Sequence, residues 1–301
     1  MKDKKTLWSF KSFVVLFILI IAAIIAVQIF GAARFETILA EQGEVIDGFW
    51  TEAIIIRDEK LFRSPISGRA VLMSSEGERA AAGTEIAEVR SAGQKIKIYN
   101  REPGIISFAV DGLEEDLNKD MLNQINLNNF DDFEADYQHR ISGRNINKSA
   151  PLYRVVNNFE LYLIVSADKK KAERFRLNEV IFIQEDASSE LLKGRIINIK
   201  NEIDNSFIFV KMDRFVPRWL NARRLEVNFI KNIYRGIKIP EKAIFKQPSG
   251  QGVLKVTGYN KYEFQEINIL ESGNQEAVVS GVEIGDEIIT NPEDFDYGRE
   301  G

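Results

Sequence analysis

The sequence predicts a mainly β protein that is attached to a membrane by one N-terminal helix. Three observations support this fold class. A long uncharged apolar segment lies near the N-terminus. After it, short runs rich in β-branched and aromatic residues recur, with Gly, Pro, Asn or Asp between them. No apolar heptad pattern persists for long, so the sequence does not indicate a long coiled coil.

Residues 12–33 are predicted to form a transmembrane helix. This segment contains 22 residues without a charge, and a helix needs about 20 apolar residues to cross a hydrocarbon core of roughly 30 Å. Within it, residues 13–27 include twelve Phe, Val, Leu or Ile, which together favour the bilayer by about 4 to 7 kcal/mol. A buried core helix fits less well, because no polar positions alternate with the apolar ones.

The charges before this segment predict its orientation. Lys2, Lys4, Lys5 and Lys11 precede it, and the positive-inside rule places such lysines in the cytoplasm. Residues 1–11 are therefore expected to be a cytoplasmic tail of a single-pass protein in the cell membrane, with the C-terminal domains extracytoplasmic. The alternative is a cleaved signal peptide ending near the Gly-Ala-Ala of 31–33. A signal core has only about 7–15 apolar residues, so we favour an uncleaved anchor.

The remainder of the chain is expected to form several small antiparallel β-domains. Each apolar run is short, and many alternate apolar with polar residues, which is typical of strands that are buried on one face. Turn-forming residues separate the runs. The predicted strands lie at 53–56, 105–110, 161–165, 180–183, 195–199, 207–210, 225–230, 252–256, 264–270, 277–279 and 287–290.

Residues 113–140, called the insertion below, break the β pattern. They are rich in Glu, Asp, Asn, Lys and Gln. Leu117, Met121, Leu122 and Ile125 recur at helical spacing, which predicts one short amphipathic helix. A turn is expected after it, followed by a second helix that extends through Tyr137.

Composition excludes several classes of function. The net charge is −5, which gives no basic footprint for nucleic acid. The chain has no Cys, so disulfides, thiolate metal sites and thiol catalysis are excluded. The single histidine, His139, lies in a polar stretch, and no Gly-x-Ser-x-Gly motif is present. The oxygen ligands at 128–132 lack the glycine and spacing of a calcium loop. We therefore expect no catalytic residue, no metal and no cofactor.

Two parts of the chain resemble each other. One comprises residues 64–72 and 76–89, and the other comprises residues 102–112 and 142–156. In each, Pro and Gly open a strand, a glycine follows at a tight turn, and a further strand ends the unit. We expect the glycines to adopt positive φ and the prolines to fix the entry to each strand.

These paired segments resemble the two halves of a biotinyl/lipoyl-like barrel-sandwich hybrid. Their split around an insertion resembles membrane fusion proteins, or periplasmic adaptors, of the HlyD type. Two later segments add to the resemblance. Residues 234–244, which include Gly-Ile-Lys-Ile-Pro, resemble the turn between the β-barrel and the membrane-proximal domain of that family. Residues 279–292, which include Gly-Asp-Glu-Ile-Ile, resemble its closing strand.

The resemblance covers residues 34–292 and implies an order of domains. N-terminal strands of the barrel and membrane-proximal part are expected at 34–60, and the hybrid with its insertion at 61–157. The β-barrel is expected at 158–235, and the membrane-proximal β-domain and tail at 236–301. The first and last segments are expected to return to the same place, near the bilayer.

The chain departs from the family at one point. Members that reach an outer-membrane channel carry a long helical hairpin between the two hybrid halves, whereas only residues 90–95 intervene here. We therefore expect a short-hairpin variant, and the sequence does not reveal an outer-membrane partner. A covalent carrier of biotin or lipoate is disfavoured, because Lys95 and Lys97 lack the expected neighbours such as Met-Lys-Met.

The resemblance implies a non-enzymatic adaptor subunit of an export or efflux system. Its expected partners are an inner-membrane transporter of the ABC or RND type, membrane lipid and further copies of itself. The alternative is an extracytoplasmic envelope scaffold of the same architecture that serves cell-wall or division machinery.

The densest basic and aromatic stretch is the candidate contact with a transporter or with anionic lipid. It lies in the predicted barrel, which is adjacent to the membrane-proximal domain in the family. The alternative is a barrel loop with ordinary surface arginines. The candidate residues are Arg214, Arg218, Trp219, Arg223 and Arg224.

Overall fold

The computed structural model describes residues 15, 17–18, 20–21, 36–133, 135–247, 250–259, 261–273 and 275–294. Strands account for 55% of the structure and helices for 9% of it, so the expectation of a mainly β protein is confirmed. The chain forms two compact units, one comprising Met1–Asp47 with Ile233–Gly301 and the other comprising Gly48–Asn232.

The predicted transmembrane helix at 12–33 lies almost wholly outside the described residues, as does the predicted tail at 1–11. Among the residues that the structure describes, no helix combines the length and apolar character needed to cross a membrane.

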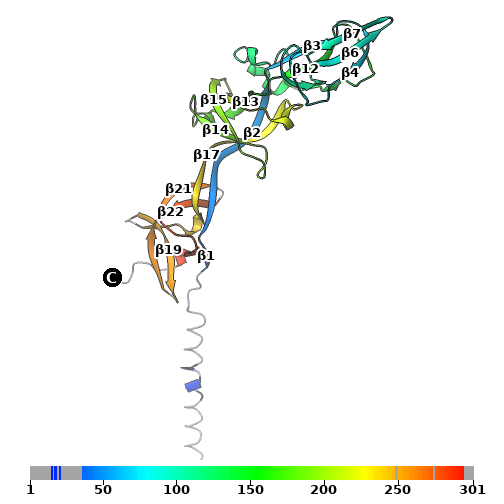
Figure 1. Cartoon of the computed structure of the whole chain (residues 1–301). Coiled ribbons are helices and arrows are strands. Elements are labelled where there is room, and N and C mark those ends of the chain that lie inside the picture. The colour runs from blue at the N-terminus through cyan, green and yellow to red at the C-terminus, as the bar shows by residue number, and fades with distance from the viewer. Residues whose placement is uncertain are drawn as a thin grey trace, which may run out of the picture. The chain divides into compact units, whose positions relative to one another are not determined.

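Two long strands contribute to both units. They are β2 (Glu41–Ile56) and β17 (Arg224–Pro240), labelled in Figure 1. The other strands of the Gly48–Asn232 unit are β3 (Glu59–Arg63), β4 (Gly68–Leu72), β5 (Arg79–Ala80), β6 (Glu85–Ser91), β7 (Gln94–Tyr99), β8 (Gly104–Ser107), β9 (Ala109–Val110), β10 (Gln138–His139), β11 (Asn145–Ile146), β12 (Pro151–Val156), β13 (Leu161–Asp168), β14 (Val180–Gln184), β15 (Leu192–Asn201) and β16 (Asn205–Met212).

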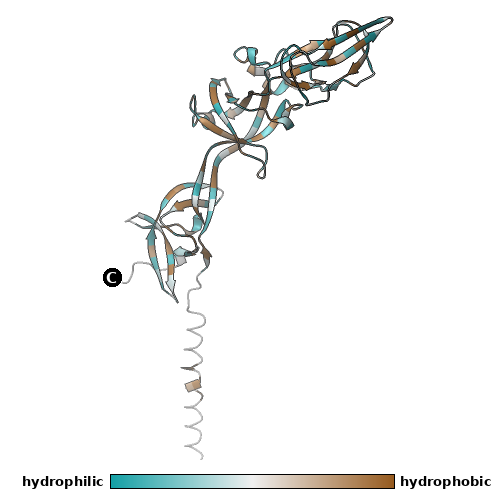
Figure 2. Cartoon of the chain, viewed as in Figure 1, coloured by the Kyte–Doolittle hydropathy of each residue, from teal (hydrophilic) through white to brown (hydrophobic). Residues whose placement is uncertain are grey.

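The first half of this unit is a barrel-sandwich hybrid, called the sandwich below. One antiparallel sheet has the order β11-β4-β6-β7, and the other has the order β3-β12-β8-β5. The paired Pro-Gly segments supply both sheets, since β4 begins at Gly68 and β8 begins at Gly104. Figure 2 shows apolar and polar residues mixed along these strands. The buried core is Ala70, Ala80, Ile86, Ala87, Val89, Ile106, Phe108, Ile146, Leu152, Tyr153 and Val155.

The glycines of the paired segments have two different roles. At the tight turns, Gly77 and Gly83 adopt φ of 76° and 86°, as expected. The strand-opening glycines do not, because their φ lies outside the positive region. They are required for close packing instead. A Cβ on Gly68 would lie 2.4 Å from the carbonyl oxygen of Arg90, and one on Gly104 would lie 2.6 Å from Val155.

The second half of this unit is a closed β-barrel. Its strands follow the order β14-β15-β16-β13-β2-β17, and a pairing between β14 and β17 closes the ring. A short helix, α2 (Lys169–Ala172), follows β13. A 3₁₀ turn, η3 (Pro217–Trp219), lies between β16 and β17. The barrel core includes Ala53, Ile55, Leu163, Val165, Ile181, Ile183, Ile196, Ile208, Val210, Trp219, Val227 and Phe229.

The insertion lacks the predicted amphipathic helix. In its described residues, which are all but 134, the helices are 3₁₀ helices, namely η1 (Lys119–Met121) and η2 (Leu127–Asp132). Asn118 caps η1 through its side chain, and asparagines favour such local turns over a continuous helix. The second helix, expected to extend through Tyr137, ends at Asp132 and is also 3₁₀.

The apolar residues of the insertion are nevertheless core residues. Leu117, Ile125, Leu127 and Phe130 are buried against the outer face of the barrel. That face comes from β2, β13 and β16 and comprises Ile54, Ile56, Tyr162, Ile164, Phe207 and Phe209. Of the four positions at helical spacing, Leu117 and Ile125 are buried and Met121 and Leu122 are partly buried, but the local structure assigned to them was wrong.

The other unit contains a five-stranded sheet with the order β1-β23-β19-β18, in which β20 also pairs with β19. The strand β1 (Thr37–Leu39) pairs with β23 (Glu287–Ile289), so the first and last described strands lie side by side, as expected. The remaining elements are β18 (Phe245–Gln247), β19 (Gly250–Gly258), β20 (Lys261–Glu266), β21 (Asn268–Gly273), β22 (Glu276–Ser280), η4 (Glu241–Ala243) and η5 (Pro292–Asp294).

The substitution Gly68→Ala is expected to destabilise the sandwich by about 1–3 kcal/mol, because the new Cβ must push a neighbouring backbone carbonyl away. Urea unfolding of the purified protein measures this. Gly93→Ala is the matched control, since its Cβ meets nothing within 4 Å and only its φ of 76° opposes the change. Equal losses for the two variants would contradict the close-packing role of Gly68.

Candidate functional site: the junction between the sandwich and the barrel

Buried charged residues gather where the chain passes between the sandwich and the barrel, all within the Gly48–Asn232 unit. Arg57 directly follows β2, Glu59 is the first residue of β3, and Asp111 directly follows β9. Arg154 lies in β12, and Arg223 directly precedes β17. All five side chains are buried. Ends of strands from both domains therefore bring these charges together.

Arg223 has the most complete set of partners. Its Nε donates to Asp111 Oδ2 at 2.6 Å, and its Nη2 donates to Glu59. Its Nη1 donates to the backbone carbonyls of Ile55 and Leu117, each at 3.3 Å. The guanidinium thus contacts two carboxylates, the barrel strand β2 and the insertion at once.

Arg154 approaches the same carboxylate from the sandwich. Its Nη1 donates to Glu59 Oε2 at 2.8 Å. Its Nη2 donates to the carbonyl of Leu220 at 2.8 Å and to Asn221 Oδ1 at 2.9 Å, both in the loop before β17. Glu59 therefore bridges one arginine of the sandwich and one arginine of the barrel.

The electrostatics of the cluster favour the charged forms of Asp111 and Arg223. Burial raises the pKa of Asp111, but the Arg223 guanidinium outweighs burial, so the pKa of Asp111 lies below its usual range. Burial lowers the pKa of Arg223, but Glu59 and Asp111 together raise it above the usual arginine range. Charge-assisted hydrogen bonds in a water-poor environment are the strong ones, so the cluster holds a fixed geometry.

Arg57 is held differently. Its Nη2 donates to the carbonyl of Trp219 at 2.6 Å and to that of Ala222. No carboxylate lies within ion-pair distance of it among the described residues, and its Nε and Nη1 have no hydrogen-bond partner there. Burial, followed by repulsion from Arg223, lowers the pKa of Arg57 to about 10.

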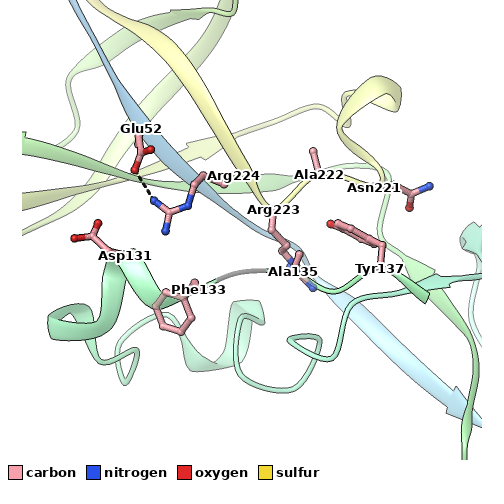
Figure 3. Close-up of a pocket in the computed structure, with 9 residues that line it drawn as sticks. All are labelled: Glu52, Asp131, Phe133, Ala135, Tyr137, Asn221, Ala222, Arg223 and Arg224. Atoms are coloured by element: carbon pink, nitrogen blue, oxygen red, sulfur yellow. Dashed lines mark hydrogen bonds and ion pairs between the residues drawn. The ribbon is translucent and has the colours of Figure 1, made fainter. Parts of the chain in front are cut away.

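A cavity of about 750 Å³ opens beside the cluster (Figure 3). Arg224 lies at this cavity and pairs with Glu52 at 2.5 Å. Tyr137 also lines it, and burial raises the pKa of the Tyr137 hydroxyl. The lining residues are Glu52, Asp131, Phe133, Ala135, Tyr137, Asn221, Ala222, Arg223 and Arg224.

The arrangement is suited to holding domains together and not to catalysis. Glu59 and Asp111 are both occupied by arginines, and the carboxylate of Glu114 accepts the backbone N–H groups of Asp111 and Gly112. Proton transfer needs a carboxylate that can reach a substrate. Among the described residues, no cluster of three or more His, Asp or Glu side chains could hold a metal ion.

The residues of the candidate contact divide into two groups. Arg214 pairs with Glu190 at 2.8 Å and Arg218 pairs with Glu185 at 2.5 Å, and both arginine side chains are about half exposed. Arg224 is partly exposed. These three stay candidates for a contact with a partner or lipid.

The surface position expected for Arg223 and Trp219 is corrected by the structure. Arg223 is 2% exposed and Trp219 is 1% exposed. Trp219 belongs to the barrel core, and its indole Nε1 donates to Glu185. Basic and aromatic residues that are adjacent in sequence are separated here because the η3 turn directs Trp219 inward.

The sequence interpretation missed Arg57, Glu59, Asp111 and Arg154. The sequence nevertheless contains a signal for these buried charges. Arg57 follows the apolar run 53–56, Asp111 follows the run 105–110, and Arg154 interrupts the run 152–156. Charged residues are almost never fully buried unless they are paired, so charges inside or next to such runs indicate a buried ionic cluster.

A second set of charges ties the insertion to the barrel. Glu160, just before β13, accepts Lys119 of the insertion and Lys211 of β16, the latter at 3.0 Å. Burial raises the pKa of Glu160, but hydrogen bonds from Lys119, Lys211 and Tyr162 outweigh it and lower the pKa from 4.5 to about 2.

Glu59→Gln is expected to destabilise the Gly48–Asn232 unit by about 3–5 kcal/mol, because two buried arginines lose their shared counter-charge. Chemical denaturation followed by circular dichroism measures the loss. The control is Glu190→Gln, which removes an exposed pair with Arg214 and should cost about 0–1 kcal/mol. A Glu59→Gln variant as stable as the control would contradict the role of the cluster.

Glu160→Gln is expected to flatten the acid dependence of stability. The folded-state pKa of Glu160 is depressed, so its contribution is complete above its ordinary pKa of 4.5 and is lost as the pH falls through about 2. The free energy of unfolding, measured in urea at a series of pH values, should fall less steeply in this window for the variant. Parallel curves for variant and wild type would oppose this assignment.

Two family models match the chain. The RND related, barrel-sandwich hybrid domain matches residues 59–157, and the RND related, beta-barrel domain matches residues 161–233. Together the two matches cover more than half of the chain. No curated protein matches it.

Several solved structures are similar to the chain. ZneB from Cupriavidus metallidurans is 12% identical with a TM-score of 0.40, over 85% of this chain and 92% of that chain. MacA from Actinobacillus actinomycetemcomitans is 11% identical with a TM-score of 0.38, over 85% and 99%. A putative efflux transporter from Bacteroides eggerthii is 13% identical with a TM-score of 0.37, over 90% and 98%.

The matched domains are those of membrane fusion adaptor proteins, which are non-enzymatic, and the expectation that this protein is not an enzyme is confirmed. A sandwich and a barrel are matched by the two RND related domain models in the order that the structure has them, and these matches support the membrane fusion protein family.

Proposed function

We propose that this protein is a membrane-anchored adaptor subunit of an export or efflux system and that it docks on an inner-membrane transporter of the ABC or RND type. The observation that carries the proposal is the match of residues 59–157 and 161–233 to two RND-related domains. An adaptor acts through surfaces and rigid modules, and a junction in which buried Glu59 is paired with both Arg154 and Arg223 fits that task.

The proposed anchor is the segment 12–33, with its N-terminus in the cytoplasm. Its 22 uncharged residues favour a transmembrane helix. Only residues 34–36 separate it from β1 in the sequence, and three residues reach at most about 10 Å. Because β1 pairs with β23, this short connection supports a membrane-proximal β-domain made of the first and last strands.

The proposed domain order is 34–60, 61–157, 158–235 and 236–301, as in adaptors of the HlyD type. Within it, we propose a short-hairpin variant. The strands β6 and β7 are joined only by Ala92 and Gly93, and Gly93 adopts φ of 76° at this tight turn. Such a turn supports an adaptor that lacks a long helical hairpin between the two halves of the sandwich.

The proposed partners also include membrane lipid and further copies of this chain. Arg214 and Arg218 provide half-exposed guanidinium groups on the loop between β16 and β17. Arginine forms bidentate contacts with carboxylates and phosphates, so this loop could bind an acidic surface of a transporter or anionic headgroups.

Deletion of the gene is expected to reduce export without changing cell shape, and the tagged full-length protein is expected to co-purify with a transporter from detergent-solubilised membranes. Mass spectrometry of the purified complex identifies the transporter. Normal export together with defective cell shape or septation would overturn the proposal and favour the envelope scaffold.

Arg214→Glu combined with Arg218→Glu is expected to reduce co-purification with the transporter or binding to vesicles that contain anionic lipid. The reason is that two half-exposed positive charges become negative. Lys193→Glu, another exposed cation of the barrel, is the matched control. If both associations persist unchanged in the double variant, this loop is not the contact.

A further inference from the structure

We propose that the sandwich and the barrel of the Gly48–Asn232 unit move as one rigid body, locked by the buried ionic cluster and by the insertion. Domains within one chain usually move relative to each other unless their interface is large and apolar. Here two independent features oppose such motion, one ionic and one apolar.

The ionic feature is that Glu59 and Arg154 each have partners on both sides of the junction. Glu59 accepts Arg154 from the sandwich and Arg223 from the barrel. Arg154 also donates to the backbone of Leu220 and to Asn221 in the barrel loop. Bending at the junction would separate at least one carboxylate from an arginine in a water-poor interior, so bent states are strongly disfavoured.

The apolar feature is the course of the insertion. It leaves the sandwich after β9 and returns at β10, and these two strands pair with each other, Gln138 with Val110 and His139 with Ala109. Both ends of the insertion are therefore fixed to the sandwich side. Its middle part, however, packs on the outer face of the barrel. The insertion thus acts as a strap between the two domains.

Polar contacts hold the insertion on the barrel at several points along its length. Lys119 pairs with Glu160, which lies just before β13. Lys200 of β15 donates to the carbonyl of Asn123 at 3.0 Å, and Arg224 of β17 donates to the carbonyl of Phe130 at 2.6 Å. Three different parts of the barrel therefore hold the insertion, and a hinge at the junction would have to break contacts with all of them.

The proposed rigid connection between the sandwich and the barrel does not depend on the proposed export function, because it concerns only contacts inside one unit. It implies that any displacement of the barrel is transmitted to the sandwich without loss. In an adaptor built in this way, the barrel and the sandwich would move together, and the junction would not act as a flexible linker between them.

The absence of Cys from the sequence allows a direct test by pulsed electron paramagnetic resonance with pairs of spin-labelled cysteines on the full-length protein in detergent. The pair across the junction is Gln94→Cys in β7 with Lys193→Cys in β15, both exposed. The pair within the sandwich is Gln94→Cys with Arg79→Cys. We expect equally narrow distance distributions for the two pairs. A broad or multimodal distribution across the junction alone would overturn the proposal.

The contribution of the cluster is tested by Asp111→Asn and, separately, by Glu59→Gln in the labelled proteins. Each is expected to broaden the distribution across the junction while the distribution within the sandwich stays narrow. Asp111→Asn is the milder change, because Glu59 still neutralises Arg223. The matched control Glu226→Gln, at an exposed position of β17, should leave both distributions unchanged. A narrow distance distribution across the junction in both cluster variants would show that the cluster does not hold the sandwich and the barrel together.

Discussion

The structure of the Gly48–Asn232 unit depends on one carboxylate, that of Glu59, which two arginines share inside the protein. Arg154 comes from the sandwich and Arg223 from the barrel, and removing such charges from water costs several kcal/mol per ion. That cost is offset only while each charge keeps its partner. Neither domain holds a complete set of partners by itself, so the packing of one on the other is a condition for the stability of both.

The insertion explains why three of the barrel strands are unusually apolar. The strands β2, β13 and β16 contain nearly continuous buried runs, at 53–56, 161–165 and 206–210. One face of each run fills the barrel, and the other face lies under the insertion. Strand β15 instead alternates buried and exposed residues over much of its length. Coverage by the insertion is therefore the physical reason why some barrel strands are apolar on both faces.

These features agree with a membrane fusion protein that acts without chemistry of its own. The buried carboxylates are saturated by arginines and backbone amides, so none is available as an acid or base. The groups that remain at the surface, such as Arg214 and Arg218, can serve recognition. Under the proposed adaptor function, the unit would keep its shape while these surface groups bind a partner.

The sequence by itself determined the mainly β class, most strand positions and the paired Pro-Gly segments, because these follow from local periodicity and turn chemistry. It also indicated apolar core positions of the insertion, but not the 3₁₀ conformation of η1, whose first turn is capped by the side chain of Asn118. Only the tertiary structure decided that Arg223 is an internal partner of Glu59 and not part of a surface patch. The two residues are 164 positions apart. Their pairing depends on how two domains meet, and no local pattern contains that information.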